Sequence, residues 1–124
     1  MSPEDLLKSS NADLERFAVS AEPEDLQNLF NTIWEKVRPL YAGQPKSMES
    51  AHGLSLAQAA LSLASHARDQ RLLIEAWHMM GRSLSANEEF EKAIPFYRQV
   101  ISGLENLGDK ERAARLRLAL IGVL

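Results

Sequence analysis

The chain has 124 residues, of which 45% are hydrophobic and 25% charged, with a formal net charge of −3 and no cysteine. These values are ordinary for one soluble globular domain, and they exclude disulfide bonds, thiolate metal sites and cysteine nucleophiles. The small acidic excess gives no reason to expect binding to nucleic acid or to an anionic membrane, and no apolar run is long enough for a membrane span. The first residues, MSPEDLLKSS, lack the basic segment and apolar core of a secretory signal, so a cytoplasmic location is expected.

Residues 1–41 predict N-terminal helices. Pro3 and Pro23 are each followed by two acidic residues, a pattern typical of the first turn of a helix, where carboxylates face the positive end of the helix dipole. After the second of these starts, apolar residues recur at spacings of three and four, as expected of an amphipathic helix that packs on a core. Residues 42–47 contain Gly, Pro and Ser and predict a loop.

The next expected helix spans residues 48–68 and is rich in alanine. Small side chains on one face permit close packing against a neighbouring helix; here they are Ala57, Ala59, Ala60, Ala64 and Ala67. A shift of 40 residues aligns Leu56 with Phe96 and Ala60 with Val100. We therefore interpret this segment as the second helix of a degenerate repeat whose first helix contains Trp34.

Residues 74–107 predict two amphipathic helices separated by a short turn at Asn87 and Glu88. Apolar residues on each side of the turn recur at spacings of three and four. Helices of this length, joined by so short a turn, must fold back on each other as an antiparallel pair.

The same stretch resembles a tetratricopeptide (TPR) repeat, a helical hairpin of about 34 residues with a W-x2-L-G-x2-Y and A-x3-F signature. The residues on its successive signature positions are Trp77, Met80, Gly81, Leu84, Phe90, Ala93 and Tyr97. The resemblance implies an all-α fold in which antiparallel helical hairpins stack as a short TPR-like α-solenoid. A single domain would then span residues 1–124, with residues 74–107 as one complete repeat.

The resemblance also implies packing roles within this repeat. Gly81 and Ala93 are expected where the two helices approach most closely, and Phe90 and Tyr97 are expected to fill the space on either side. A Gly usually ends the first helix of such a repeat, but Glu88 stands at that position. Asn87 is therefore expected to adopt the left-handed conformation that ends the helix.

Residues 109–124 predict the first helix of a further repeat, because Leu118, Ile121 and Gly122 reproduce the signature spacing at an offset of 41. A terminal repeat normally has a polar outer face, whereas this helix ends on the apolar sequence ALIGVL. We therefore expect either a longer protein or coverage by another chain, for example a homodimer formed through this helix. The self-association residues would be Leu116, Leu120, Ile121 and Leu124.

The search for chemistry gives no catalytic motif. The sequence contains no HExxH, no Gly-rich phosphate loop and no serine nucleophile motif, so an enzyme, a metal site and a cofactor are not expected. Recognition of a partner remains. By resemblance to the TPR pattern, the residues facing the concave surface are Glu75, His78, Arg82 and Ser85. His78 and Arg82 are four residues apart and can reach one carboxylate together, or these residues are ordinary solvated side chains.

Three functions follow from these observations. The first is a non-enzymatic protein–protein interaction module, a scaffold or adaptor that binds a peptide or helix of a partner protein. The second comes from the repeat length near 40, which resembles the long-repeat TPR arrays of bacterial signalling proteins. It is an N-terminal sensory or autoinhibitory segment of a larger signalling or effector protein. The third is a self-assembling oligomerisation element.

Overall fold

The computed structural model describes residues 11–41 and 48–123, and each element within these ranges is a helix. This confirms the predicted all-α class. The predicted helix start at Pro3, the predicted loop at 42–47 and Leu124 lie outside the described residues. The helices are α2 (Asn11–Ser20), α3 (Pro23–Tyr41), α4 (Met48–Ala67), α5 (Gln70–Ala86), α6 (Phe90–Asn106) and α7 (Lys110–Val123).

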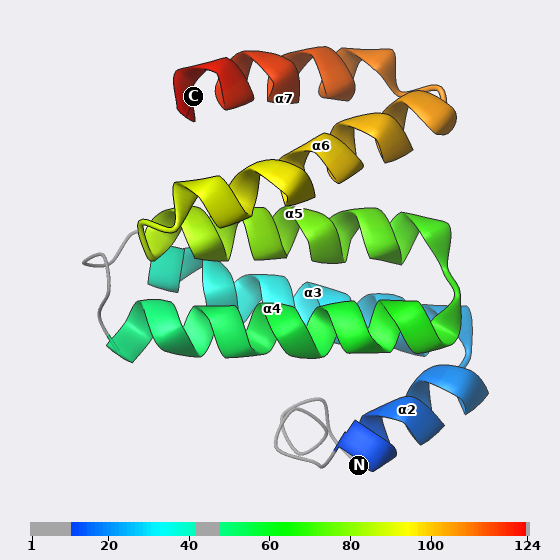
Figure 1. The fold of residues 1–124 in the computed structure, drawn as a ribbon. Helices are drawn as coiled ribbons and strands as arrows, with labels where there is room; N and C mark the ends of the chain where they lie inside the picture. Colours follow the sequence, from blue (N-terminus) through cyan, green and yellow to red (C-terminus); the bar gives the residue numbers. More distant parts are fainter. Residues whose placement is uncertain (1–10, 42–47, 124) are drawn as a thin grey trace.

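The helices pack in chain order. Each of α3, α4, α5 and α6 packs against the helix that follows it, α3 also contacts α5, and α2 packs on α4 (Figure 1). In Figure 1, α5, α6 and α7 follow one another upward from α4, with α3 behind α4 and α2 below. The contact between α3 and α5 brings two helices that are not consecutive onto one side of the molecule.

The core consists of two apolar clusters. The larger cluster joins α2, α3, α4 and α5, and its α3 contribution is the predicted stripe that includes Leu29, Phe30 and Ile33. The predicted alanine face of α4 is buried: Ala57, Ala60 and Ala64 are completely inaccessible to solvent. The smaller cluster joins α6 and α7 to Ile74 of α5, with Trp77 partly buried against it.

Close approaches between α5 and α6 depend on glycine. A Cβ atom at Gly81 would lie 3.1 Å from the Tyr97 ring, and Ala93 is fully buried, as their predicted packing roles require. The expectation for Phe90 is wrong: its side chain is 45% exposed, because it stands at the first residue of α6, beyond the reach of α5. A Cβ at Gly103 would lie 2.7 Å from Cγ1 of Ile74.

The turn between α5 and α6 is closed by two backbone hydrogen bonds. The N–H of Glu88 donates to the carbonyl of Ser85 at 3.0 Å, and the N–H of Glu89 donates to that of Leu84 at 2.8 Å. This pattern is a Schellman motif, which needs one residue in the left-handed region. That residue is Glu88, with φ of 60°, whereas Asn87 has φ of −92°. The expectation that Asn87 is left-handed is therefore wrong, because the turn closes one residue later.

The same turn geometry recurs along the chain. Arg68, Glu88 and Gly108 all have positive φ, and each is followed by an acidic residue that precedes the next helix. The turn at Gly108 has hydrogen bonds of the same kind, at 3.0 and 2.8 Å. Asp69 and Asp109 accept hydrogen bonds from the first N–H groups of α5 and α7. Helices of nearly equal length therefore alternate in direction, as the offset of about 40 residues in the sequence indicated.

Glu88 and Gly108 provide a matched test of the backbone strain in these turns. A left-handed residue other than glycine costs about 1–2 kcal/mol, so Glu88→Gly should increase the free energy of unfolding by about 0.5–1 kcal/mol. Gly108→Ala should decrease it by about 1 kcal/mol, since a Cβ there has no atom within 4 Å and adds backbone strain alone. Urea denaturation measures both values. If both substitutions shift the midpoint in the same direction, the turn conformation does not control stability here.

Candidate functional site

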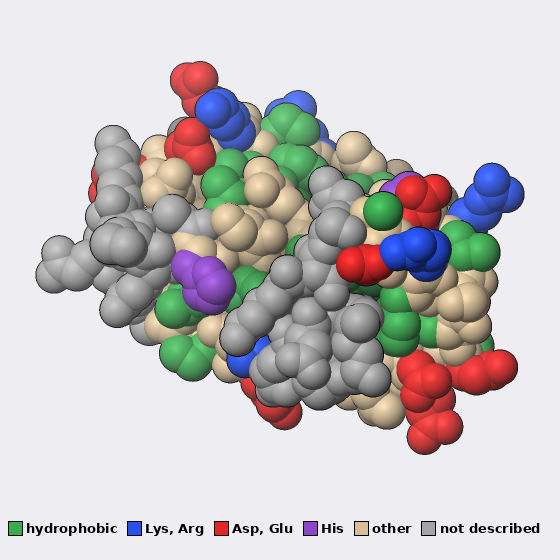
Figure 2. Space-filling model, turned by 90° about the horizontal axis from the view of Figure 1, so that it is seen from below, with side chains coloured by type: hydrophobic (Ala, Val, Ile, Leu, Met, Phe, Trp, Pro, Cys, Tyr) green, Lys and Arg blue, Asp and Glu red, His purple; other side chains and the backbone are tan. Residues whose placement is uncertain are grey.

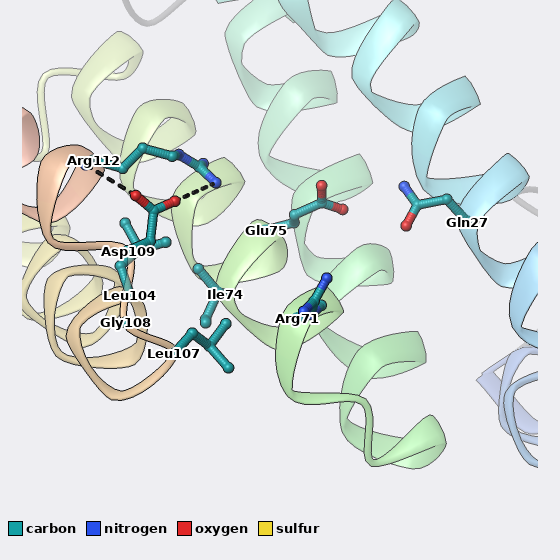
Figure 3. A pocket seen from close by; sticks show the side chains of 9 residues that line it. All are labelled: Gln27, Arg71, Ile74, Glu75, Leu104, Leu107, Gly108, Asp109 and Arg112. Carbon is teal, nitrogen blue, oxygen red and sulfur yellow. Dashed lines mark hydrogen bonds and ion pairs between the residues drawn. The ribbon is translucent and has the colours of Figure 1, made fainter.

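Two adjoining hollows lie between α3, α5 and α7, and we call them together the groove. The larger, of about 570 Å³, is shown in Figure 3 and is lined by Gln27, Arg71, Ile74, Glu75, Leu104, Leu107, Gly108, Asp109 and Arg112. The smaller, of about 200 Å³, is lined by Trp34, Arg38, Ile74, Glu75, His78, Arg82 and Arg112. The hollows share Ile74, Glu75 and Arg112, so the groove is continuous past these three side chains.

One face of α5 forms the floor of the groove. Arg71, Glu75, His78 and Arg82 are separated by four, three and four residues, a spacing that places them on one side of a helix. The structure therefore brings together Glu75, His78 and Arg82, three of the four residues predicted for the concave surface.

The fourth, Ser85, lies elsewhere. It does not line either hollow, and its Oγ is 3.5 Å from the hydroxyl oxygen of Tyr97 on α6. Ser85 is therefore part of the contact between α5 and α6. The helical rotation from Arg82 to Ser85 turns the side chain toward α6.

The sequence analysis missed the residues that α3 and α7 contribute. Trp34 and Arg38 come from α3, and Arg112 comes from α7. A signal for them exists: Arg71 and Arg112 are 41 residues apart, which is the offset found between the repeats. Applying that offset to every groove position of α5 would have indicated these two helices as the walls.

The groove carries an excess of positive charge although the chain has a net charge of −3. Its charged side chains, apart from the titratable His78, are Arg38, Arg71, Arg82 and Arg112 against Glu75 and Asp109. By contrast, the face seen in Figure 2 shows basic side chains standing apart from one another among those that are coloured. The positive charge is therefore concentrated between α3, α5 and α7.

Neighbouring groups hold two of these arginines in place. The guanidinium carbon of Arg38 lies 5.3 Å from the centroid of the Trp34 ring, a cation–π contact that keeps the charge at the groove wall. Arg112 pairs with Asp109 at 3.9 Å, and its backbone N–H also donates to that carboxylate, as Figure 3 shows. Arg38 retains N–H donors for a bound group, because stacking on a ring uses none of them.

His78 lies between two aromatic rings. Its ring centroid is 5.8 Å from that of Trp34 and 6.2 Å from that of Tyr97, with both contacts edge-to-face. Burial, together with the charges of Arg82 and Arg112, lowers the pKa of His78 to about 4. His78 is therefore neutral at pH 7, so it contributes a hydrogen-bonding ring to the groove and no positive charge.

Glu75 is the carboxylate at the junction of the two hollows. Burial raises its pKa above the ordinary value of 4.5; the charge of Arg112 and the amide of Gln27 oppose this shift, and Asp69 adds to it. Its Oε2 atom is buried without a hydrogen-bond partner. An ionised carboxylate with such an oxygen is poorly compensated, which makes Glu75 the least stable charge in the groove.

The residues predicted for self-association are mostly part of this chain's own core. Leu120 is 8% exposed and belongs to the smaller cluster, and Leu116 is partly buried against it. The expectation that Leu120 offers an apolar surface to a second copy is wrong for this arrangement, because α6 covers it. The side chain of Ile121 and all of Leu124 lie outside the described residues. Leu118, by contrast, is 71% exposed.

None of three comparisons, with protein-family models, with curated proteins and with solved structures, finds a significant match to this chain. Within residues 11–41 and 48–123, no group of three or more His, Asp or Glu side chains is placed to hold a metal ion. In the same part of the chain, none of the helices combines the length and apolar character that crossing a membrane requires.

The environment of His78 predicts an acid-dependent loss of stability. In the unfolded chain this histidine takes up a proton near its ordinary pKa of 6.5, whereas the folded protein resists protonation until about pH 4. The unfolded state binds more protons between these values, so the free energy of unfolding should fall as the pH decreases from 6.5 to 4, by up to about 3 kcal/mol. His78→Phe should remove this part of the pH dependence in thermal denaturation. His52→Phe, at an exposed position of α4, is the control; a wild-type slope in His78→Phe would contradict the assignment.

Proposed function

We propose that this protein is a non-enzymatic interaction module, a short array of TPR-like helical hairpins that binds a segment of a partner protein in the groove. The observation that supports this most directly is the continuous hollow surface with an arginine excess between α3, α5 and α7. A surface that is both concave and charged against the net charge of its chain is typical of a recognition site. The proposed place of action is the cytoplasm.

The chemistry of the groove favours an acidic segment. Arg38 and Arg82 present planar guanidinium groups that bind carboxylates with two parallel hydrogen bonds. The Trp34 ring and the neutral His78 ring offer an apolar surface beside them for the stems of acidic side chains or for an aromatic residue. Hydrogen bonds to charged groups contribute about 1.5–3 kcal/mol each, so a few carboxylates are enough for a specific contact. The sensory or autoinhibitory alternative differs in its occupant, which would be an acidic segment of the same polypeptide.

The arginines of the groove should control binding. We expect Arg82→Ala and Arg38→Ala each to weaken binding of an acidic peptide by at least about tenfold, equivalent to about 1.4 kcal/mol, with little change in melting temperature. The measurement is fluorescence anisotropy with a panel of short labelled peptides that range from fully acidic to fully neutral. Arg115→Ala is the control, because Arg115 is exposed on α7 and pairs with Glu111 outside the groove. Equal binding across the panel, or equal loss in Arg115→Ala, would overturn the proposed role of the groove.

Self-assembly is a second candidate, favoured by the exposure of Leu118 on α7. Its side chain and that of Val19 on α2 are both 71% exposed, which makes Val19 a matched control. If copies associate through α7, light scattering should show a mass that increases with concentration for the wild type and for Val19→Glu. Leu118→Glu should remain a monomer, because a charge cannot be buried in an apolar contact without a partner. A monomer mass for the wild type at all concentrations would contradict this function.

A further inference from the structure

Glu75 occupies the position that any extended ligand in the groove must pass. It lines both hollows, together with Ile74 and Arg112, so a segment that runs from one hollow to the other crosses it (Figure 3). Ile74 is an apolar neighbour, and Arg112 is already paired with Asp109 at 3.9 Å. A ligand carboxylate held by the groove arginines therefore comes close to the Glu75 carboxyl group.

Two carboxylates at close range cannot both remain ionised without a large cost. The charged and titratable groups that face Glu75 in the groove are Arg38, Arg71, His78, Arg82, Asp109 and Arg112. From α3, the uncharged amide of Gln27 faces it, and Asp69 before α5 adds a weak repulsion. The arginines attract the ligand carboxylate as well as Glu75, and they do not remove the repulsion between the two.

The enclosure of Glu75 shows which carboxyl group accepts the proton. Its Oε2 has no hydrogen-bond partner and no contact with solvent, so its ionised form lacks the compensation that a carboxylate between two arginines has. Burial already favours the neutral form of Glu75 in the unliganded protein. The ligand carboxylate, in contact with guanidinium groups, keeps its charge.

We propose that the groove binds a ligand carboxylate together with one proton, which Glu75 takes up from solvent, so that the neutral Glu75 donates a hydrogen bond to that carboxylate. This inference rests on the proposed function, since it concerns the same groove and its acidic ligand. The ligand carboxylate belongs either to an acidic side group or to the C-terminus of the bound segment, which share this chemistry. Glu75 is then a specificity residue: it rejects acidic ligands when ionised and binds them when protonated.

The sign of the pH dependence follows directly. Affinity is highest where Glu75 is already protonated and falls as the pH increases through its pKa in the free protein toward its higher pKa in the complex. Acidic side chains of the ligand lose their charge near pH 4.3. Affinity should therefore decrease with increasing pH between about pH 5 and 8, by about tenfold for each unit by which binding raises the pKa of Glu75.

Titration calorimetry tests this proposal with an oligoglutamate peptide in two buffers that differ in their enthalpy of ionisation. The wild type should take up protons on binding. Glu75→Gln should take up none, lose the pH dependence and bind at least about tenfold more tightly near pH 8, because its amide is neutral at every pH and donates as the protonated carboxyl does. Glu105→Gln, at an exposed position of α6 that pairs with Arg117, should behave like the wild type. Circular dichroism melting curves establish that each variant is folded.

The outcomes separate this inference from the proposed function. If the peptide binds in an Arg82-dependent way, but without proton uptake and with the same affinity in Glu75→Gln, the inference is overturned and the proposed function stands. Weaker binding by Glu75→Gln would also overturn it, since Glu75 would then act as a carboxylate. If no acidic peptide binds at any pH, the proposed function fails and the inference with it. Peptides with an amidated or a free C-terminus distinguish the two sources: uptake that requires the free terminus assigns the C-terminal carboxylate, and uptake with both assigns an acidic side group.

Discussion

The arrangement of the whole molecule depends on how each helix ends. Paired backbone hydrogen bonds at Glu88–Glu89 and at Gly108–Asp109 force the chain to reverse direction within a few residues. Because the same reversal occurs at regular intervals, alternate helices run in the same direction and α3, α5 and α7 come to one side. The groove is a consequence of this alternation, and so is its composition, since those helices supply most of its walls.

One helix, α5, serves the core and the groove at once. Its buried residues, which include Leu72, Ala76 and Met79, hold it between α4 and α6, while Glu75 and His78 face α3 and α7. Because the core face is fixed, the groove side chains are held at the edge of an apolar interior. This partial burial shifts the pKa values of both residues toward their neutral forms, the carboxyl upward and the imidazole downward. A helix exposed on all sides with the same sequence would have neither property.

The sequence was sufficient for the helices and for local contacts between neighbours. Apolar spacing located every helix of the described residues, and Gly81 was recognised as a close approach because its role follows from one hairpin. The errors concern features that depend on exact rotation or on distant segments. The left-handed residue was placed one position early, Ser85 was assigned to the groove when it faces Tyr97, and Leu120 was expected to be exposed.

The groove itself could be predicted in part. Glu75, His78 and Arg82 lie on one helix, where a period of 3.6 residues relates them. Arg38 and Arg112 come from helices that are far apart in the sequence, and they meet α5 through the stacking of three hairpin arms. Periodicity within one helix contains no information on that distance. Burial was also invisible in the sequence, which is why His78 was expected to accompany Arg82 as a carboxylate ligand without regard to its neutral state at pH 7.

The position of Trp34 gives the protein a built-in optical probe. Its indole ring lines the smaller hollow, with the Arg38 guanidinium over its face and the His78 ring at its edge. The emission of an indole depends on the polarity and charge of its immediate surroundings, and any molecule that draws Arg38 away from the ring changes both. The second indole, Trp77, packs between α5 and the smaller cluster and does not line the groove. With Trp77 replaced by phenylalanine, the fluorescence spectrum would report occupancy of the groove without an attached label.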